Sequence, residues 1–343
     1  MGISAGKFRR YHANKILNFV DPSTLFANIT DFFRFIRGYF ESKEIISEFD
    51  PDVVFAKGGY VSLPVGFAAR SLGYPLVIHE SDSIMGLSNK LLSKRADKVC
   101  VSYPPKFYKE DVPKDKLLYT GNPVREDILD GTKERAITEF SIDPKKPTLL
   151  VIGGSQGALV INQVISQALA SLLPKYQIIH VSGERDYDWL GFQADKLDPE
   201  LRKNYYLYNF LSGNLKDAYA AADLVISRAG NNVIAELAAL GKPTILIPLD
   251  SSANNHQFSN AKILSRMGAA MLVQQETLTP ATLKRKVDYL FDNPEELRGM
   301  SEKIATLASP EAAKNVAYTI HDLGEVFIAS GKEGEKDEAE PTE

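Results

Sequence analysis

The feature that most constrains this chain is a series of short apolar runs that alternate with segments of helical pattern. In runs such as 148–153 (TLLVIG) and 223–228 (DLVISR), apolar residues follow one another instead of alternating with polar ones. Strands of this kind are covered on both faces, as in a parallel sheet between two layers of helices. Such runs occur at residues 52–57, 75–80, 98–103, 117–121, 148–153, 177–182, 205–210, 223–228, 244–249 and 270–275. We therefore predict an α/β fold built on parallel sheets.

The runs fall into two groups, and 343 residues are too many for one ordinary domain. A polar, turn-rich segment separates the groups. We predict a first domain over 1–128, a linker over 129–147 and a second domain over 148–308. We expect a C-terminal helix over 309–330 that packs back on the first domain. Residues 331–343 hold six acids and two bases, which predicts a disordered acidic tail.

The first group of strands lacks the usual opening of its fold. A doubly wound domain normally begins with a strand and a glycine-rich turn. No strand pattern precedes Asp52, and no such turn precedes residue 58. We therefore expect the first domain to be incomplete at its start.

Composition excludes several classes of protein. Cys100 is the only cysteine, and the five histidines show no metal-ligand spacing, so neither a disulfide framework nor a metal site is indicated. No apolar stretch reaches the roughly 18–20 residues that a membrane span needs. No signal-peptide pattern is visible at the N-terminus. We expect a cytosolic protein with no cofactor and no nucleic-acid partner.

The run at 148–153 ends in the sequence GGSQGA, and a helical pattern follows it. Glycines allow a ligand to lie against the main chain, and the first-turn N–H groups of a helix favour phosphate. We predict an anion site at Gly153, Gly154 and Gly157, with the Ser155 hydroxyl as a further donor. A plain strand-to-helix turn is the alternative, which three glycines in five residues disfavour. The pattern is not G-x-G-x-x-G, so a nicotinamide cofactor is not indicated, and it also lacks the lysine of a P-loop.

A second glycine turn follows the run at 223–228. The chain leaves this run through Gly230 and enters a helix that carries Glu236. A carboxylate there can accept two hydroxyl hydrogens of a ribose, although a solvated helix glutamate is the alternative. The polar stretch 248–261 contains amides and His256, which suit sugar hydroxyls or a solvated loop equally.

The strands of the first group also end in polar residues. His79 and Glu80 form a titratable pair at such an end, although a histidine that caps a turn is a competing interpretation. Arg125 follows the last strand of the group and can direct its guanidinium toward a diphosphate between the two domains.

In order along the chain, GGYVS, HESD, GLSNK, TGNPVR, GGSQGA, SRAG and HQFSNA resemble the MurG-type transferase family over residues 50–325. The resemblance implies a GT-B fold, with two Rossmann-like domains facing a cleft, and an inverting glycosyltransferase that uses no metal. Such an enzyme moves N-acetylglucosamine from UDP-N-acetylglucosamine to an undecaprenyl-linked N-acetylmuramyl-pentapeptide. The reaction converts lipid I into lipid II for peptidoglycan, at the cytoplasmic face of the membrane.

The resemblance also implies site residues. Glu236 would hold the ribose hydroxyls, Gln257 the sugar hydroxyls, and the backbone of Leu211 the uracil. The implied donor-binding set is Asp82, Arg125, Ser155, Leu211, Asn231, Asn232, Val233, Ile234, Ala235, Glu236 and Gln257. Supporting positions are Tyr60, Asn89, Gly153, Gly154, Gly157, Asn162, Arg228, Gly230 and His256.

Three features depart from the family pattern. Asp82 stands where the family commonly has asparagine, and Val233 replaces a frequent threonine. The family's GGTGGH loop, whose histidine is the favoured catalytic base, has no counterpart. The base is therefore unassigned, with His79 and Glu80 as secondary candidates.

Residues 23–46 are unusually rich in aromatics and lie in a basic region. Leu25, Ile29, Phe32, Ile36 and Phe40 share one helical face, the usual core stripe. A helix packed wholly in the core explains this stripe but not the surplus aromatics. We predict a patch that rests on an anionic bilayer, formed by Phe26, Phe33, Arg34, Phe35, Arg37 and Tyr39.

Two other functions remain open at this point. A UDP-N-acetylglucosamine 2-epimerase shares the two-domain architecture and would convert the donor alone. A non-catalytic UDP-sugar-binding half of a split transferase would bind UDP without turnover until its missing segment is supplied.

Overall fold

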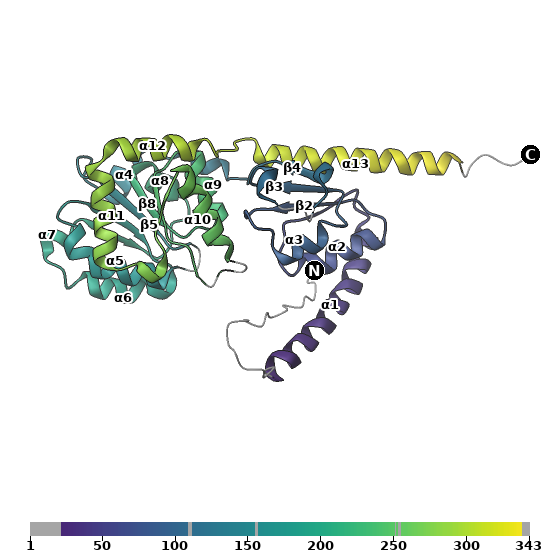
Figure 1. Ribbon diagram of the computed structural model, residues 1–343, viewed down its shortest axis with the longest axis horizontal. Coiled ribbons are helices and arrows are strands. Elements are labelled where there is room, and N and C mark those ends of the chain that lie inside the picture. Colours follow the sequence, from purple (N-terminus) through teal and green to yellow (C-terminus); the bar gives the residue numbers. More distant parts are fainter. Residues whose placement is uncertain (1–21, 109–111, 155–156, 251, 253–254, 338–343) are drawn as a thin grey trace, which may run out of the picture. The chain divides into compact units, whose positions relative to one another are not determined.

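The computed structural model describes residues 22–108, 112–154, 157–250, 252 and 255–337 (Figure 1). The chain divides into two compact units, one of residues 1–121 and 311–343 and the other of residues 122–310. The chain therefore passes from one unit to the other twice. Each unit is built on its own parallel sheet.

Unit 1 has four parallel strands in the order β1-β2-β3-β4. They are β1 (Val54–Ala56), β2 (Leu76–Glu80), β3 (Lys98–Val101) and β4 (Leu117–Tyr119). The helices are α1 (Pro22–Phe49), α2 (Ser62–Ser71), α3 (Leu87–Leu92) and α13 (Ala312–Asp337), with short 3-10 turns η1 (Pro105–Phe107) and η2 (Lys114–Lys116). Helices α2 and α3 lie on one face of the sheet and α13 on the other (Figure 1). On the face of the sheet that α13 covers, Val316 of this helix packs with Val77 and Cys100 in a buried cluster.

Unit 2 has six parallel strands in the order β10-β9-β8-β5-β6-β7. They are β5 (Thr148–Ile152), β6 (Gln177–Val181), β7 (Tyr205–Tyr208), β8 (Leu224–Ser227), β9 (Thr244–Leu246) and β10 (Met271–Leu272). The helices are α4 (Lys133–Phe140), α5 (Leu159–Leu172), α6 (Glu184–Ala194), α7 (Pro199–Arg202), α8 (Leu215–Ala221), α9 (Asn231–Ala239), α10 (His256–Met267), α11 (Pro280–Asp292) and α12 (Pro294–Ala305), with 3-10 turns η3 (Glu126–Asp130) and η5 (Gln275–Thr277).

Helices cover both faces of the second sheet. Helices α5, α6 and α11 lie on one face, and α4, α8, α9 and α12 lie on the other (Figure 1). All five residues of β5 are buried, as expected for a strand covered on both sides. Each of the ten predicted runs contains one strand, and both sheets are parallel, so the predicted fold class is confirmed.

Two predicted segments differ from the structure. The expected linker 129–147 contains α4, which packs on α8 because it buries Ala136 and Phe140. Helix α13 continues to Asp337, into the segment predicted to be disordered, because its glutamates and lysines are good helix formers. Residues 338–343 lie outside the described residues.

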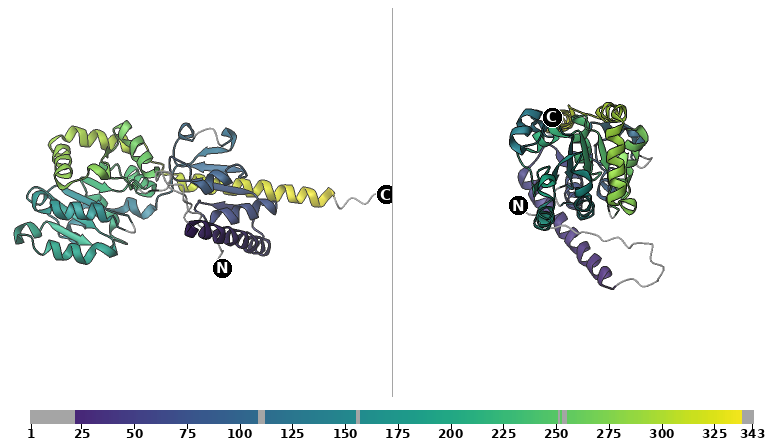
Figure 2. Two further views of the ribbon diagram at one scale, coloured as in Figure 1. Left: turned by 60° about the horizontal axis from the view of Figure 1, so that its bottom comes forward. Right: turned by 90° about the vertical axis from the view of Figure 1, so that its left-hand side faces the viewer.

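Helix α1 packs through a different face from the one predicted. Ile29, Phe32 and Phe40 of the expected core stripe are 48%, 51% and 62% exposed. The buried positions are Asp31, Gly38, Ser42 and Ile46, and the small Gly38 and Ser42 among them allow close approach to α2. Its first turns project away from the sheet of unit 1 (Figure 2). Among the helices described, none combines the length and the apolar character that crossing a bilayer requires.

Candidate functional site

Two strands of unit 2 meet at the point where the order of the sheet reverses. The chain places β6 and β7 on one side of β5, and then places β8, β9 and β10 on the other side. Strands β5 and β8 are parallel neighbours, with Ile152 opposite Ser227 at their carboxyl ends. In open α/β sheets, ligands bind beyond the carboxyl ends of two such strands, because their connections leave in opposite directions. Both glycine-rich turns of the sequence follow these two strands.

The turn after β5 needs glycine for two different physical reasons. A Cβ on Gly153 would lie 2.5 Å from Ala158 N, and one on Gly157 would lie 2.5 Å from Ser182 O. Gly154 has a φ of 85°, which side chains disfavour, and a Cβ there would meet no described atom within 4 Å. Packing therefore explains two of these glycines, while Gly154 leaves room for a ligand against the main chain. The predicted hydroxyl donor Ser155 lies outside the described residues.

The helices after the two turns begin without a capping side chain. The residue before α5 is Ala158, and the residue before α9 is Gly230. Neither residue can accept a hydrogen bond from the first-turn N–H groups through its side chain. Such N–H groups, at the positive end of the helix dipole, favour an anion. Each of the two strand ends is therefore followed by groups that suit a phosphate.

Glu236 lies in the second turn of α9 and is half-buried. Its Oε2 accepts a hydrogen bond from the Tyr219 hydroxyl across 2.9 Å. Burial raises the pKa of Glu236, while the Tyr219 hydrogen bond and the nearby Arg125 lower it. Asn122 Nδ2 donates to Asn232 Oδ1 across 3.0 Å, which ties the segment before Arg125 to the first turn of α9. The structure thus brings Arg125, Asn232 and Glu236 into one neighbourhood.

A buried polar network lies beneath the glycine turn. Asn162 Nδ2 donates to Ser182 O across 2.9 Å and to Asp186 Oδ2 across 2.7 Å. Asn162 Oδ1 lies 3.0 Å from His180 Nε2, and His180 Nδ1 lies 2.8 Å from the Tyr205 hydroxyl. Because an amide oxygen only accepts, His180 carries its proton on Nε2 and accepts from Tyr205. Burial lowers the pKa of His180 to about 3, so the ring is neutral.

Other predicted donor residues hold the loops of unit 2 together. Arg228 Nη1 donates to Ile247 O and to Pro248 O, each across 3.2 Å, and so joins the end of β8 to the end of β9. Gln257 Oε1 accepts from Leu249 N across 3.0 Å. In the described part of the chain its Nε2 makes no hydrogen bond, so that group can still donate to a ligand.

The remaining predicted residues of unit 2 contribute through their backbone or position. Leu211 has a buried side chain close after β7, which is compatible with a role for its main chain. Asn231 and Ile234 are buried, Val233 and Ala235 are half-buried, and Asn232 is exposed. His256 is half-buried at the first position of α10.

The predicted residues of unit 1 hold its loops in place through hydrogen bonds. Glu80 accepts hydrogen bonds from Asp82 N, Gly86 N and Asn89 Nδ2, across 3.0, 2.9 and 3.0 Å. His79 Nε2 lies 2.9 Å from Gly121 O. Burial raises the pKa of Glu80 and lowers that of His79. Both side chains are almost fully buried, at 5% and 1% exposure, so they support the loop in this structure, and their catalytic role stays a prediction.

Sequence reasoning missed several members of these clusters. Asn122 lies inside the TGNPVR motif, so its neighbours in the sequence could have indicated it. Tyr219, His180 and Tyr205 lie in apolar segments and carry no sequence signal of a site. Two residues that the sequence did predict, Tyr60 and Asp82, follow strands of unit 1. Tyr60 is 45% exposed, and Asp82 is half-buried.

The predicted membrane patch is partly exposed. Phe33, Arg34 and Arg37 are exposed, whereas Tyr39 is half-buried. Phe35 is half-buried because its ring packs edge-to-face on Phe67 of α2, with centroids 6.1 Å apart. The side chain of Phe26 lies outside the described residues. Ile29, Phe32 and Phe40 add to the exposed aromatic and aliphatic surface of α1.

Comparisons with known proteins match both units. The glycosyltransferase family 28 N-terminal domain matches residues 15–101, and the family 28 C-terminal domain matches residues 148–316. A protein of Lachnoclostridium phytofermentans is 39% identical over 295 residues, which are 85% of this chain and 76% of the relative. It is named UDP-N-acetylglucosamine–N-acetylmuramyl-(pentapeptide) pyrophosphoryl-undecaprenol N-acetylglucosamine transferase.

Solved structures share the fold. The crystal structure of Acinetobacter baumannii MurG matches with a TM-score of 0.68 at 28% identity, over 84% of this chain and 79% of that chain. A UDP-GlcNAc 2-epimerase from Neisseria meningitidis, solved with UDP-GlcNAc, matches with a TM-score of 0.59 at 15% identity, over 84% and 81%. At 15% identity, this match shows only that the two proteins share a fold.

Proposed function

The chain belongs to the family of UDP-N-acetylglucosamine–N-acetylmuramyl-(pentapeptide) pyrophosphoryl-undecaprenol N-acetylglucosamine transferases, and from this premise we propose how it works. It is a hexosyltransferase that carries N-acetylglucosamine from UDP-N-acetylglucosamine to lipid I, and so forms lipid II. It therefore acts in peptidoglycan synthesis. The reaction as proposed needs no cofactor, because the donor carries its own leaving group, UDP.

One observation supports the donor site above all others. Strands β5 and β8 are neighbours at the reversal of strand order, and each leads through a glycine turn into a helix without a capping side chain. We place the donor pyrophosphate against these N–H groups, with Arg125 as a further positive charge. Glu236 receives the ribose hydroxyls, and Gln257 Nε2 donates to the sugar.

The proposed step is a single displacement with inversion. The C4 hydroxyl of the acceptor attacks C1 of the sugar and gives up its proton to a base, the bond from C1 to the diphosphate oxygen breaks, and UDP leaves. The residue that takes this proton is not assigned. Negative charge grows on the leaving diphosphate. The helix N–H groups and Arg125 stabilise that charge, because they are already oriented before the reaction begins.

We also propose that α1 holds the enzyme at the cytoplasmic face of the membrane. Ile29, Phe32, Phe33 and Phe40 are exposed on a helix that also exposes Arg34 and Arg37. Apolar side chains can enter the headgroup region while the arginines pair with anionic lipids. Such contact would bring the enzyme to its lipid-linked acceptor.

The test is an assay with UDP-N-acetylglucosamine and a lipid I analogue, with the products identified by mass spectrometry. We expect lipid II and UDP from the full chain. Glu236→Ala should weaken UDP binding by about 10- to 100-fold in calorimetry, because hydrogen bonds to a charged group are lost. Glu302→Gln, an exposed glutamate of α12, is the matched control and should bind UDP normally.

Three outcomes would contradict the proposal. Formation of the 2-epimer from the donor alone would favour the epimerase. Binding of UDP without turnover would favour the non-catalytic alternative. Full UDP affinity in Glu236→Ala would exclude the ribose contact.

A further inference from the structure

Helix α8 carries a buried hydroxyl to which the proposed function gives no task. Tyr219 is fully buried, and it donates its one hydroxyl hydrogen to Glu236 Oε2 across 2.9 Å. Within the described residues, Glu236 Oε1 makes no hydrogen bond. One carboxylate oxygen is therefore anchored from α8, while the other can receive a ligand. Oε2 can still accept a second hydrogen, because each carboxylate oxygen has two lone pairs.

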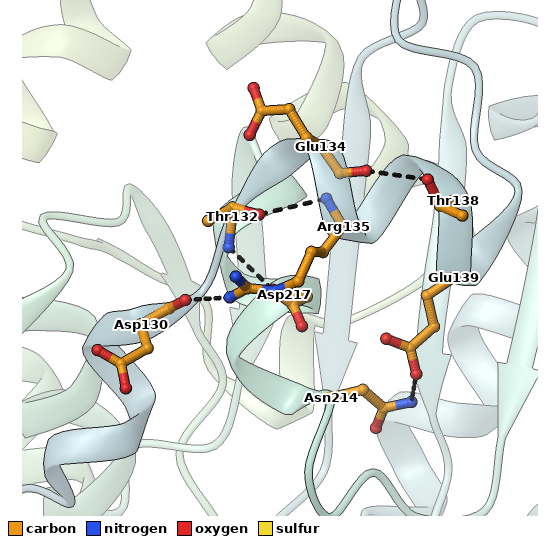
Figure 3. A network of polar contacts seen from close by, with 8 residues as sticks. All are labelled: Asp130, Thr132, Glu134, Arg135, Thr138, Glu139, Asn214 and Asp217. Atoms are coloured by element: carbon orange, nitrogen blue, oxygen red, sulfur yellow. Dashed lines mark hydrogen bonds and ion pairs between the residues drawn. The ribbon is translucent and has the colours of Figure 1, made fainter.

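Helix α8 is itself held in place by Asp217, two residues before Tyr219. Asp217 is almost fully buried, and its Oδ1 accepts from Thr132 N across 2.8 Å and from Arg135 Nε across 3.0 Å (Figure 3). Arg135 also donates to Asp130 O. This one carboxylate thus ties α8 to the start of α4, and Arg135 joins the start of α4 to the end of η3.

Two further contacts fix the same helix. Asn214 Nδ2 donates to Glu139 Oε1 across 2.7 Å, so the start of α8 is joined to the end of α4 (Figure 3). Gly131 lies against the main chain of α8, since a Cβ there would be 2.0 Å from Lys216 O. The backbone that carries Tyr219 therefore has little freedom to shift relative to the segment before it.

We propose that Tyr219 is a positioning residue of the donor site: from the anchored helix α8, it holds the Glu236 carboxylate in the orientation that receives the ribose hydroxyls. The inference rests on the proposed function, because it takes Glu236 as the ribose ligand. Asp217 acts one step further away, through the placement of α8. Without the Tyr219 hydroxyl, the carboxylate keeps its place on α9 but can rotate about its side-chain bonds, and ligand binding must then restrict that rotation.

The charges around Glu236 give the inference a second readout. The groups that face it are Tyr219 from α8, Arg125 from the segment before η3, and Asp127 in η3. Burial and Asp127 raise the pKa of Glu236, while Tyr219 and Arg125 lower it. Removal of the Tyr219 hydroxyl should therefore raise this pKa further. Because the ionised carboxylate is the better acceptor, UDP affinity should then begin to fall at a higher pH as the solution is acidified.

The experiment measures UDP binding by calorimetry between pH 5 and pH 8 for the full chain, Tyr219→Phe, Glu236→Ala and the double variant. We expect Tyr219→Phe to weaken UDP binding about 3- to 10-fold at neutral pH, as for the loss of one hydrogen bond. The acidic fall in affinity should shift to higher pH. In the Glu236→Ala background, Tyr219→Phe should have no further effect. With 2′,3′-dideoxyuridine diphosphate, the difference between Tyr219→Phe and the unsubstituted chain should vanish.

The control is Tyr176→Phe, which removes another buried tyrosine hydroxyl that donates to a carboxylate, Asp288, across 2.8 Å near α11. It should leave UDP affinity and its pH dependence unchanged. If Tyr219→Phe keeps full UDP affinity while Glu236→Ala binds UDP more weakly, the inference is overturned and the proposed function is not. An equal loss for the dideoxy ligand would also overturn it, because a purely structural effect does not depend on the ribose hydroxyls. No UDP binding by the unsubstituted chain, or full affinity in Glu236→Ala, would overturn the proposed function together with the inference.

Discussion

Several polar side chains at the strand ends direct their hydrogen bonds into the protein. Arg228 joins two strand ends, and Asn162 of α5 holds the loop at the end of β6. Glu80 accepts hydrogen bonds from two N–H groups of the loop that follows it and from the Asn89 amide of α3. A buried polar group left without a partner costs about 1–3 kcal/mol, so each of these loops is strongly specified. At the scale of single residues, the loops at the strand ends are therefore supported by a layer of amides and charged groups behind them.

His180 in this layer should make stability depend on pH. Burial lowers its pKa to about 3, against about 6.5 in an unfolded chain. Between these values the unfolded state binds more protons, so the free energy of unfolding should fall as the pH is lowered from 6.5. By pH 5, the titration of His180 should lower the free energy of unfolding by about 2 kcal/mol relative to neutral pH.

The measurement is urea unfolding at pH 7, 6 and 5 for the full chain and for His180→Gln. The variant should be less stable at pH 7, because the contacts to Asn162 and Tyr205 are disturbed. The difference between the two proteins should shrink as the pH falls, since glutamine does not titrate. If the difference in unfolding free energy between the two proteins stays constant with pH, His180 is not buried in its neutral form.

At the scale of elements, helix α1 shows how packing selects a face. Its side toward α2 presents Gly38 and Ser42, and its opposite side presents Phe32, Phe33 and Phe40. Ser42 satisfies its hydroxyl on Gly38 O across 2.6 Å, so a polar residue can be buried there at little cost. The exposed aromatics then require another explanation, which the proposed membrane contact supplies.

Replacement of two of these aromatics should release the protein from membranes. Phe33 and Phe40 lie two turns apart on one face and are 63% and 62% exposed. Phe33→Ser with Phe40→Ser should weaken binding to anionic phospholipid vesicles by about a hundredfold or more, because burial of each ring contributes about 1.5–3 kcal/mol. Vesicle co-sedimentation provides the measurement.

Phe192→Ser is the matched control for this experiment. Phe192 is equally exposed, lies near Lys196 and belongs to α6 of unit 2. It should leave vesicle binding unchanged. Full retention of the α1 variant on vesicles, or an equal loss in the control, would contradict the proposed role of α1.

At the scale of the whole molecule, each unit has its own sheet and its own buried residues. The core of unit 2 is formed by β5, β6, β8 and β9 together with α5 and α11, and all of these lie between residues 122 and 310. Arg125, Glu236 and Gln257 belong to the same unit, as does Tyr219. Asp82 is the one predicted donor residue that belongs to unit 1.

A fragment of residues 122–310 should therefore fold and bind UDP without the rest of the chain. We expect one cooperative unfolding transition and a UDP affinity close to that of the full chain. Calorimetry of the fragment and of its Glu236→Ala variant provides the test. A folded fragment that fails to bind UDP would show that unit 1 supplies an essential part of the nucleotide site.

The sequence by itself predicted the ten strands, the two parallel sheets and the two glycine turns at β5 and β8. These features depend on local signals, since continuous apolar runs and clustered glycines have a structural meaning that hardly depends on distant residues. The ordered motifs also predicted the family. The strand reversal that places the turns side by side became visible only in the sheet order.

Tertiary structure alone decided the buried face of α1, the helix within 129–147 and the support of Glu236 by Tyr219. In each case the outcome depends on a partner outside the segment itself: α2 for α1, α8 for α4, and α8 for Glu236. The apolar neighbours of Tyr219 along the chain predict only that it is a core residue. Only the tertiary structure, which brings Glu236 of α9 within 2.9 Å of the Tyr219 hydroxyl, gives that hydroxyl an acceptor, and that acceptor gives it a proposed role.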